Sequence, residues 1–132
     1  MTRTEERHQR ILKLAERLVK KSKTGIPILV EGLNDLRSLR SLGVEGEIFC
    51  VKGSGAGFHD FINRFRKEKE LIVMTDFDNE GRELSRTLTR ELCHMRIKAD
   101  SSIRSQMEGL VKSEIKGVEE LAGYIEKVKT AS

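Results

Sequence analysis

The chain of 132 residues has the size of one ordinary domain and is long enough to bury a core without disulfides or metal staples. Its two cysteines, Cys50 and Cys93, lack CxxC or Cys/His spacing, which argues against a zinc ribbon and against a disulfide scaffold. The charged N-terminus and the lack of a long apolar run argue against a signal peptide and a membrane span. We therefore expect a soluble, cytoplasmic protein.

The positive charge of the chain is concentrated at its N-terminus. Residues 1–25 hold eight Lys and Arg against three acids, whereas residues 26–132 hold 17 against 18. A basic segment attached to a balanced domain is typical of a protein that binds a polyanion such as nucleic acid, because phosphate contacts release counterions. A solvated helix face would explain the same charge.

Residues 5–22 are predicted to form an amphipathic helix, because apolar side chains recur at helical spacing and basic ones occupy the other side. The apolar set is Ile11, Leu14, Ala15, Leu18 and Val19, and the basic set is Arg3, Arg7, Arg10, Arg17 and Lys21. If the basic side faces phosphates, Arg7, Arg10 and Arg17 contact nucleic acid.

From residue 26 to 99, short apolar runs alternate with helical patterns. The predicted strands are 26–30, 48–51, 71–74 and a weaker one at 95–99; helices are predicted at 33–42, 58–65, 79–94, 103–111 and 118–128. The connections are long enough for right-handed crossovers, so the natural arrangement is an α/β fold with a parallel sheet covered by helices. We expect a single domain over 1–132, with a basic helix in 1–25, an α/β core over 26–99 and a helical extension over 100–132.

Three of the four predicted strands end in polar or glycine-rich segments, namely Glu31-Gly32, 52–57 and 76–81. In parallel sheets, ligands bind outside the carboxyl ends of the strands. This edge of the sheet is therefore the predicted functional edge.

Asp76, Asp78 and Glu80 stand at alternate positions after the third strand. Carboxylates at alternate positions of an extended segment point the same way, so Asp76 and Asp78 can share a cation, and Glu80 can join them where the chain turns into the helix. Hard oxygen ligands favour Mg²⁺ or Mn²⁺ over zinc. Helix capping by Asp78 or Asn79 is the alternative, but it explains only one of the three acids.

Glu31 ends the first buried strand and is followed by glycine. A buried carboxylate without a partner is costly, although a tight turn at the surface would also place an acid here. If the strands before Glu31 and Asp76 are adjacent, the carboxylates converge on one site, and their repulsion favours a bound cation.

The glycine-rich segment 53–57 lacks the Gly-Lys-Ser/Thr ending of a P-loop and the GxGxxG register. It is either a flexible turn from strand to helix or a backbone contact to a nucleic-acid phosphate, and Lys52 beside it is either solvated or a phosphate ligand. Asp35 is expected to help start the helix after Glu31, and its contact with metal-bound water stays open.

Two segments resemble the Toprim domain of topoisomerases, bacterial primases, OLD-type nucleases and the small ribonuclease that matures 5S rRNA. The first is ILVEGLND (28–35), with the motif glutamate at Glu31; the second is TDFDNEGRE (75–83), with the Asp-x-Asp motif at Asp76 and Asp78; Gly53 matches the family's glycine after the second strand. The resemblance implies a four-stranded parallel sheet, a metal held by the aspartates, and a glutamate that acts as general acid or base on phosphodiester bonds.

The whole chain is most similar to the small stand-alone Toprim proteins of archaea. Residues 116–119 (KGVE) resemble the tail of the 5S-maturing ribonuclease. The segment after Asp78 is similar to type IA topoisomerases, in which the glutamate matching Glu80 can also bind metal, but Arg82 replaces their next acid. The size of the chain excludes a topoisomerase and argues against a complete primase.

The resemblance and the residue pattern together predict a small Toprim nuclease that depends on Mg²⁺ or Mn²⁺ and acts on RNA or DNA. In this hypothesis Asp76, Asp78 and Glu80 hold the metal, and Glu31 moves the proton. Nucleic acid is bound by Lys52 and Gly53 together with Arg7, Arg10 and Arg17. The alternative is a non-catalytic nucleic-acid-binding module, or a subunit that needs a protein partner for chemistry.

Overall fold

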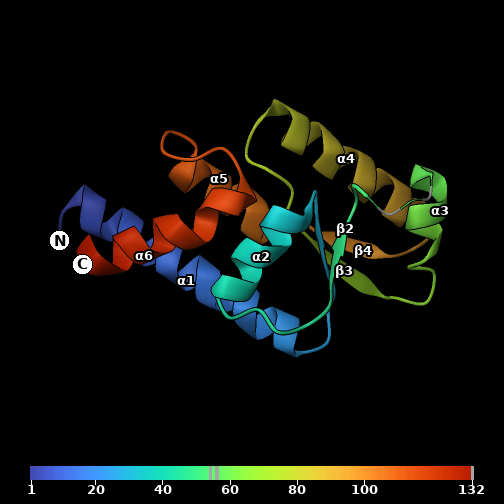
Figure 1. Cartoon of the computed structure of the whole chain (residues 1–132), viewed down its shortest axis with the longest axis horizontal. Helices are drawn as coiled ribbons and strands as arrows, with labels where there is room; N and C mark the ends of the chain where they lie inside the picture. The colour runs from blue at the N-terminus through green and yellow to red at the C-terminus, as the bar shows by residue number, and fades with distance from the viewer. Residues whose placement is uncertain (54, 56, 132) are drawn as a thin grey trace.

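The computed structural model describes residues 1–53, 55 and 57–131 and has an α/β architecture (Figure 1). Its elements are α1 (Arg3–Lys23), β1 (Ile28–Val30), α2 (Leu33–Ser41), β2 (Ile48–Cys50), α3 (Phe58–Asn63), β3 (Glu70–Val73), α4 (Asn79–His94), β4 (Lys98–Asp100), α5 (Ser102–Val111), the 3-10 helix η1 (Val118–Glu120) and α6 (Leu121–Ala131). The predicted α/β fold is confirmed. Ser54 and Ala56 of the predicted glycine-rich turn lie outside the described residues.

The four strands form one parallel sheet in the order β2-β1-β3-β4. Ile28 of the central strand β1 is paired with Ile48 of β2 on one side and with Ile72 of β3 on the other. β4 continues the sheet beyond β3, with Leu71 opposite Ala99. The two inner strands, β1 and β3, are apolar and largely buried because helices cover both faces of the sheet, as is usual for parallel sheets, whereas the edge strand β4 holds Lys98 and Asp100.

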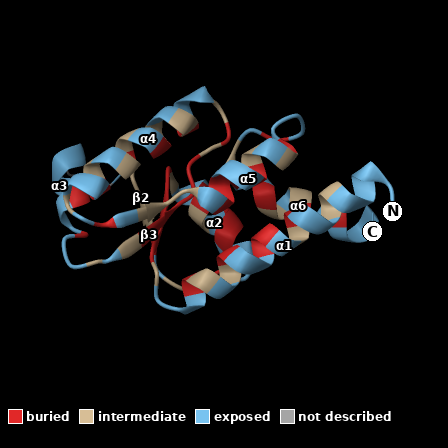
Figure 2. Cartoon of the chain, turned by 180° about the vertical axis from the view of Figure 1, so that it is seen from behind, coloured by how far each residue is buried: buried red, intermediate tan, exposed pale blue. Residues whose placement is uncertain are grey.

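Successive side chains of β1 and β3 enter two separate cores. Ile28 and Val30 pack with α1, α2, α5 and α6, whereas Leu29 packs with α3 and α4. In Figure 2, the buried positions of α1 and α2 lie toward one face of the sheet, and those of α4 lie toward the other face. The period of two in side-chain direction explains why adjacent strand residues belong to opposite cores.

Helix α1 uses the predicted apolar side to cover the sheet. Ile11, Leu14, Ala15 and Leu18 are buried in the core shared with α5 and α6, and Val19 is partly buried against it. Thr2 and Glu5 form a capping box at the start of the helix. Among the described residues, no helix is both long and apolar enough to cross a membrane.

The largest departure from the predicted elements is at the fourth strand. It begins at Lys98 rather than at residue 95, because Met95 and Arg96 still form the turn that ends α4. Their N–H groups donate to carbonyls of the last helical turn, and Arg96 has a positive φ of 61°. A backbone in this left-handed region cannot continue a strand.

Two predicted apolar helix positions are exposed. Phe58 is 37% exposed and Leu33 is 55% exposed, although both were expected on buried helix faces. Each residue is the first of its helix, so it lies beyond the core that the later turns cover. Phe65 is buried as expected, but in the turn after α3, which ends at Asn63.

Candidate functional site

The strand order creates a crevice between the carboxyl ends of β1 and β3. After β1 the chain continues through α2 to β2, which lies on one side of β1, whereas β3 lies on the other side of β1. Helices α2 and α4 pack in different cores, so they diverge from the sheet where β1 and β3 end. Such a topological switch point is where ligands bind in open α/β sheets. Glu31 follows β1, and Asp76 lies three residues after the end of β3.

Glu31 is 7% exposed, and its Oε2 accepts a 2.7 Å hydrogen bond from the main-chain N–H of Asp76. Its Oε1 lies 3.9 Å from Nζ of Lys52, whose side chain is 74% exposed. The carboxylate is thus held in place by a backbone donor of the segment that follows β3 and is flanked by an exposed cation. The surface-turn explanation for Glu31 is excluded by this burial.

The surroundings of Asp76 disfavour the charged form of its carboxyl group. Its Oδ1 accepts a 2.8 Å hydrogen bond from the N–H of Val118, and its carboxyl group also shares a hydrogen bond with Glu31. Burial raises the pKa of Asp76; the Val118 N–H opposes this, whereas the nearby charges of Glu31 and Asp78 raise the pKa further, to about 6. Two carboxylates this close favour either a shared proton or a cation.

Asp78 caps α4, as the helix-capping alternative predicted. Its Oδ1 accepts a 2.7 Å hydrogen bond from the N–H of Gly81, and Phe77 between the two aspartates is buried. Glu80 is exposed in the first turn of the helix. Within residues 1–53, 55 and 57–131, no three His, Cys, Asp or Glu side chains lie close enough to hold a metal ion together. The ligand set of Asp76, Asp78 and Glu80 therefore stays a prediction.

Gly81 allows the backbone to fold tightly at the Asp-x-Asp segment. A Cβ at this position would lie 1.8 Å from the carbonyl oxygen of Asp76. Thr75 closes the same turn from inside, since its Oγ1 donates a 2.6 Å hydrogen bond to the Gly81 carbonyl. The glycine in this motif is thus required by the close approach of two backbone segments.

Arg104 of α5 supports this turn, a role that was not predicted from the sequence. The side chain is buried, its Nε donates to Oγ1 of Thr75 at 2.9 Å, and a terminal nitrogen donates to the carbonyl of Asp76. Its charge is balanced by Glu108, 2.9 Å away. A charged side chain at an otherwise apolar position of a helix was the signal that could have found it.

The segment 116–119 closes the other side of the site. The Lys116 carbonyl accepts a hydrogen bond from the Phe77 N–H at 2.8 Å, next to the bond from Val118 to Asp76. A Cβ on Gly117 would approach Oδ1 of Asp76 to 3.2 Å. The resemblance of this segment to the tail of a ribonuclease thus has a structural counterpart: it supplies the main chain that orients Asp76.

Asp35 belongs to the frame of the site. It is buried, and it accepts hydrogen bonds from the N–H of Gly32, at 2.9 Å, and from the backbone of Glu119. Burial and the negative charge of Asp76 raise its pKa. Asp35 caps α2 as predicted and connects α2 to η1.

The predicted nucleic-acid-binding residues fall into two groups. Lys52 and Gly53 follow the end of β2, where Lys52 lies next to Glu31 and Gly53 has a φ of +77°. Arg10 and Arg17 are exposed and line a groove of about 550 Å³ between α1 and α5.

Two basic side chains of α1 were predicted to lie on its outer face, but they contact other elements instead. Arg7 is partly buried and donates to the Leu110 carbonyl and to the Tyr124 hydroxyl, each at 2.9 Å. Lys21 forms ion pairs with Asp100 and Glu70 at the sheet. The length of these side chains lets them reach partners on other elements, which helical spacing alone does not reveal.

The donor set at the switch point fits a hard divalent cation. All the acidic groups offer oxygen atoms, which suit Mg²⁺ or Mn²⁺. Burial and the negative charges of Glu31 and Asp78 raise the pKa of Asp76, and a bound cation would offset this repulsion. Mg²⁺ keeps several waters and is commonly bound through one or two carboxylates, so a complete cage of side chains is not needed.

A four-stranded parallel sheet with a glutamate after its central strand and an Asp-x-Asp segment at the adjacent strand defines the class of the protein as a Toprim-type α/β domain. A family model of the Toprim domain matches residues 27–119, and the chain belongs to this family.

The chain is also similar over nearly its whole length to small archaeal proteins. The UPF0292 protein of Methanocaldococcus jannaschii is 35% identical over 126 residues, which cover 95% of this chain and 97% of the relative. A UPF0292 protein of Thermococcus gammatolerans is 35% identical over 127 residues, with 96% and 92% covered. A solved structure of a protein from Aquifex aeolicus shares the fold, with a TM-score of 0.68 at 24% identity over 82% of this chain and 94% of that one.

Proposed function

We propose that this protein is a small Toprim nuclease that cleaves phosphodiester bonds of RNA or DNA with the help of Mg²⁺ or Mn²⁺. The observation that carries the proposal is the pair of carboxylates at the switch point, where Glu31 is buried and bonded to the main chain of Asp76. Membership of the Toprim family supports metal-dependent chemistry on nucleic acid.

In this proposal Glu31 transfers the proton through Oε1, because Oε2 already accepts the Asp76 N–H. Lys52 lies 3.9 Å from Oε1 and moves to a phosphate when substrate binds. Asp76 and Asp78, joined by Glu80, hold the cation. When bound, a divalent cation neutralises charge on the scissile phosphate and on the leaving oxygen.

The test is incubation of the pure protein with labelled structured RNA and DNA in Mg²⁺, Mn²⁺ or EDTA. Glu31→Gln keeps the size of the side chain and removes proton transfer, so cleavage should fall by about 10²- to 10⁴-fold while nucleic-acid binding survives. The matched control is Glu45→Gln, at an exposed position before β2, which should cleave normally. Full cleavage by Glu31→Gln would contradict the role of Glu31.

The second candidate is a nucleic-acid-binding module without cleavage of its own. It is favoured by the absence, among the described residues, of a ready-made group of three metal-binding side chains. Binding by the parent protein without cleavage of any substrate in any metal would support this candidate over the nuclease.

A further inference from the structure

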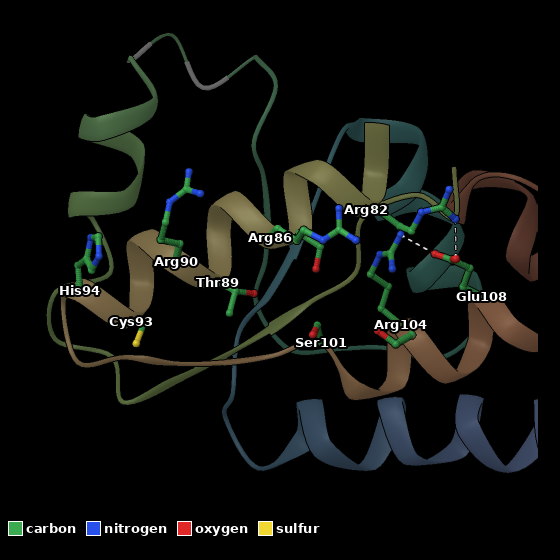
Figure 3. Close-up of a pocket in the computed structure, with 11 residues that line it drawn as sticks. Arg82, Arg86, Thr89, Arg90, Cys93, His94, Ser101, Arg104 and Glu108 are labelled. Atoms are coloured by element: carbon green, nitrogen blue, oxygen red, sulfur yellow. Dashed lines mark hydrogen bonds and ion pairs between the residues drawn. The ribbon is translucent and has the colours of Figure 1, made fainter. Parts of the chain in front are cut away.

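A groove between α4 and the start of α5 lies outside the site described above. It has a volume of about 550 Å³. Arg82, Arg86 and Arg90 line it from successive turns of α4, and hydroxyl groups of Thr89, Ser101 and Ser105 also line it. In Figure 3, Thr89 and Cys93 point from α4 toward the segment at Ser101. Arginine and hydroxyl side chains are the common partners of nucleic-acid phosphates.

The spacing of the arginines fits a repeating polyanion. Residues four apart in a helix lie about 6 Å apart along its axis, so the run from Arg82 to His94 extends over about 18 Å. A regular row of positive side chains of this length can follow the phosphates of a single strand.

Two of the four arginines that line the groove, Arg86 and Arg90, are available to a ligand. Among its described lining residues, Glu108 is the one carboxylate beside four arginines, and it is paired with Arg82 at 2.7 Å and with Arg104 at 2.9 Å. Among the described residues, Arg86 and Arg90 form ion pairs with their helix neighbours Glu83 and Glu91, and the two arginine side chains are 69% and 60% exposed. Such exposed pairs are weak and are screened by salt, so phosphates can replace them.

Arg104 connects the groove to the carboxylate site. This side chain lines the groove and also holds Thr75 and the carbonyl of Asp76. At the same end, Arg82 lies one turn beyond Asp78, the N-cap of α4. A chain of phosphates along α4 therefore ends at the Asp-x-Asp segment.

We propose that the groove between α4 and α5 binds the sugar-phosphate backbone of the nucleic acid on which Glu31 and Asp76 act. The inference rests on the proposed function, since it says where the substrate of that site lies. A single extended strand is the favoured occupant, because the arginines form one row along one helix. An acidic segment of a protein is the competing occupant, and the test below separates the two.

The variant Arg86→Gln with Arg90→Gln removes two charges that are remote from the carboxylates and retains helix propensity. Binding of a fluorescein-labelled single-stranded RNA and a DNA of the same sequence is measured in EDTA, where no cleavage occurs. The dissociation constant should rise about tenfold, and the log-log salt slope should flatten by about 1.4, since two single-strand phosphate contacts are lost. The matched control, Lys127→Gln with Lys129→Gln on exposed positions of α6, should bind like the parent.

Cys93 offers a second measurement, because it is exposed and lines the groove. In a Cys50→Ser background it is the remaining cysteine of the two, and bound oligonucleotide should slow its alkylation by N-ethylmaleimide. The protection should disappear when Arg86 and Arg90 are also changed to Gln.

Each outcome bears on the groove separately from the catalytic proposal. Unchanged affinity and unchanged Cys93 protection in the Arg86/Arg90 variant would overturn the groove, even if the parent cleaves and Glu31→Gln does not. Arginine-dependent binding without any cleavage would support the groove and contradict the nuclease. A competition experiment separates the two occupants. If poly-glutamate of matched charge displaces the labelled oligonucleotide as well as the unlabelled oligonucleotide does, the groove binds an acidic protein segment and the assignment to nucleic acid is overturned.

Discussion

The main-chain N–H of Asp76 donates a 2.7 Å hydrogen bond to Oε2 of Glu31, across 45 positions of the chain. The bond connects the ends of two adjacent parallel strands, so the relative position of the two carboxylates is set by the sheet and not by flexible side chains. The same geometry brings like charges together and makes the site dependent on a proton or a cation. The carboxylate pair on which the proposed function depends therefore lowers the stability of the fold.

The first prediction concerns Asp76, whose pKa is raised from 3.8 to about 6 in the fold. The folded protein then binds the proton more tightly than the unfolded chain, so the stability it provides is present below pH 3.8 and is lost as the pH rises to about 6. The loss is at most about 3 kcal/mol. Urea unfolding in EDTA between pH 3.5 and pH 7 should show this decline in the parent relative to Asp76→Asn.

At pH 7 a bound cation should reverse this loss. Mg²⁺ at about 100 times its dissociation constant stabilises a fold by about 2.7 kcal/mol, and Asp76→Asn with Asp78→Asn should remove the gain. Glu45→Gln serves as the control and should respond to metal like the parent. An equal melting temperature of the parent with and without millimolar Mg²⁺ or Mn²⁺ would count against the metal site.

The second prediction concerns Gly81, where a Cβ would meet the Asp76 carbonyl at 1.8 Å. Gly81→Ala should lower the free energy of unfolding by about 1–3 kcal/mol or more, because the two backbone segments must separate. Gly109→Ala in α5 is the matched control: a Cβ there meets nothing within 4 Å, so alanine should stabilise the helix by about 1 kcal/mol. Equal effects of the two substitutions in urea unfolding would refute the close-approach argument.

The third prediction concerns the ion pair of Lys21 with Asp100. Burial alone would raise the pKa of Asp100, but hydrogen bonds from Lys21 and Ser102 and the charge of Lys21 lower it to about 2. A lowered carboxylate pKa stabilises the fold above pH 3.8 and loses this effect as the pH falls to about 2. Asp100→Asn should therefore be less stable than the parent by about 2 kcal/mol at pH 6, with a difference that vanishes near pH 2.

The control for this pair is Asp60→Asn, which removes an exposed carboxylate of α3 and should leave the pH dependence of unfolding near that of the parent. A constant difference between Asp100→Asn and the parent across the acid range would mean that the ion pair does not stabilise the fold.

The fourth prediction separates the two kinds of basic residue on α1. Changing Arg10, Lys13 and Arg17 to Gln should weaken nucleic-acid binding uniformly across sequences, with a salt slope flatter by about 0.9 per duplex phosphate contact, and should leave the fold intact. Arg7→Gln should instead lower stability by about 1 kcal/mol, since it breaks the bonds to Leu110 and Tyr124. Unchanged affinity and slope in the triple variant would leave the outer face of α1 as a solvated surface.

The sequence by itself determined the elements and the motif positions. Strand and helix patterns repeat over a few residues, so the buried side of α1 and the bounds of α4 could be predicted from periodicity and from the cap at Asp78. The convergence of Glu31 and Asp76 could also be predicted, but only on the condition that their strands are adjacent.

Only the tertiary structure decided that these two strands are adjacent, and which other groups contact the site. The Val118 N–H reaches the site from η1 and the Arg104 guanidinium from α5, while the Arg82–Glu108 pair joins α4 to α5 at its edge. Arg7 and Lys21 of α1 bind partners on other elements. These contacts join residues far apart in the chain through long side chains or single backbone donors. Local periodicity carries no information about such pairs, because the order of the strands and the packing of the helices determine which groups meet.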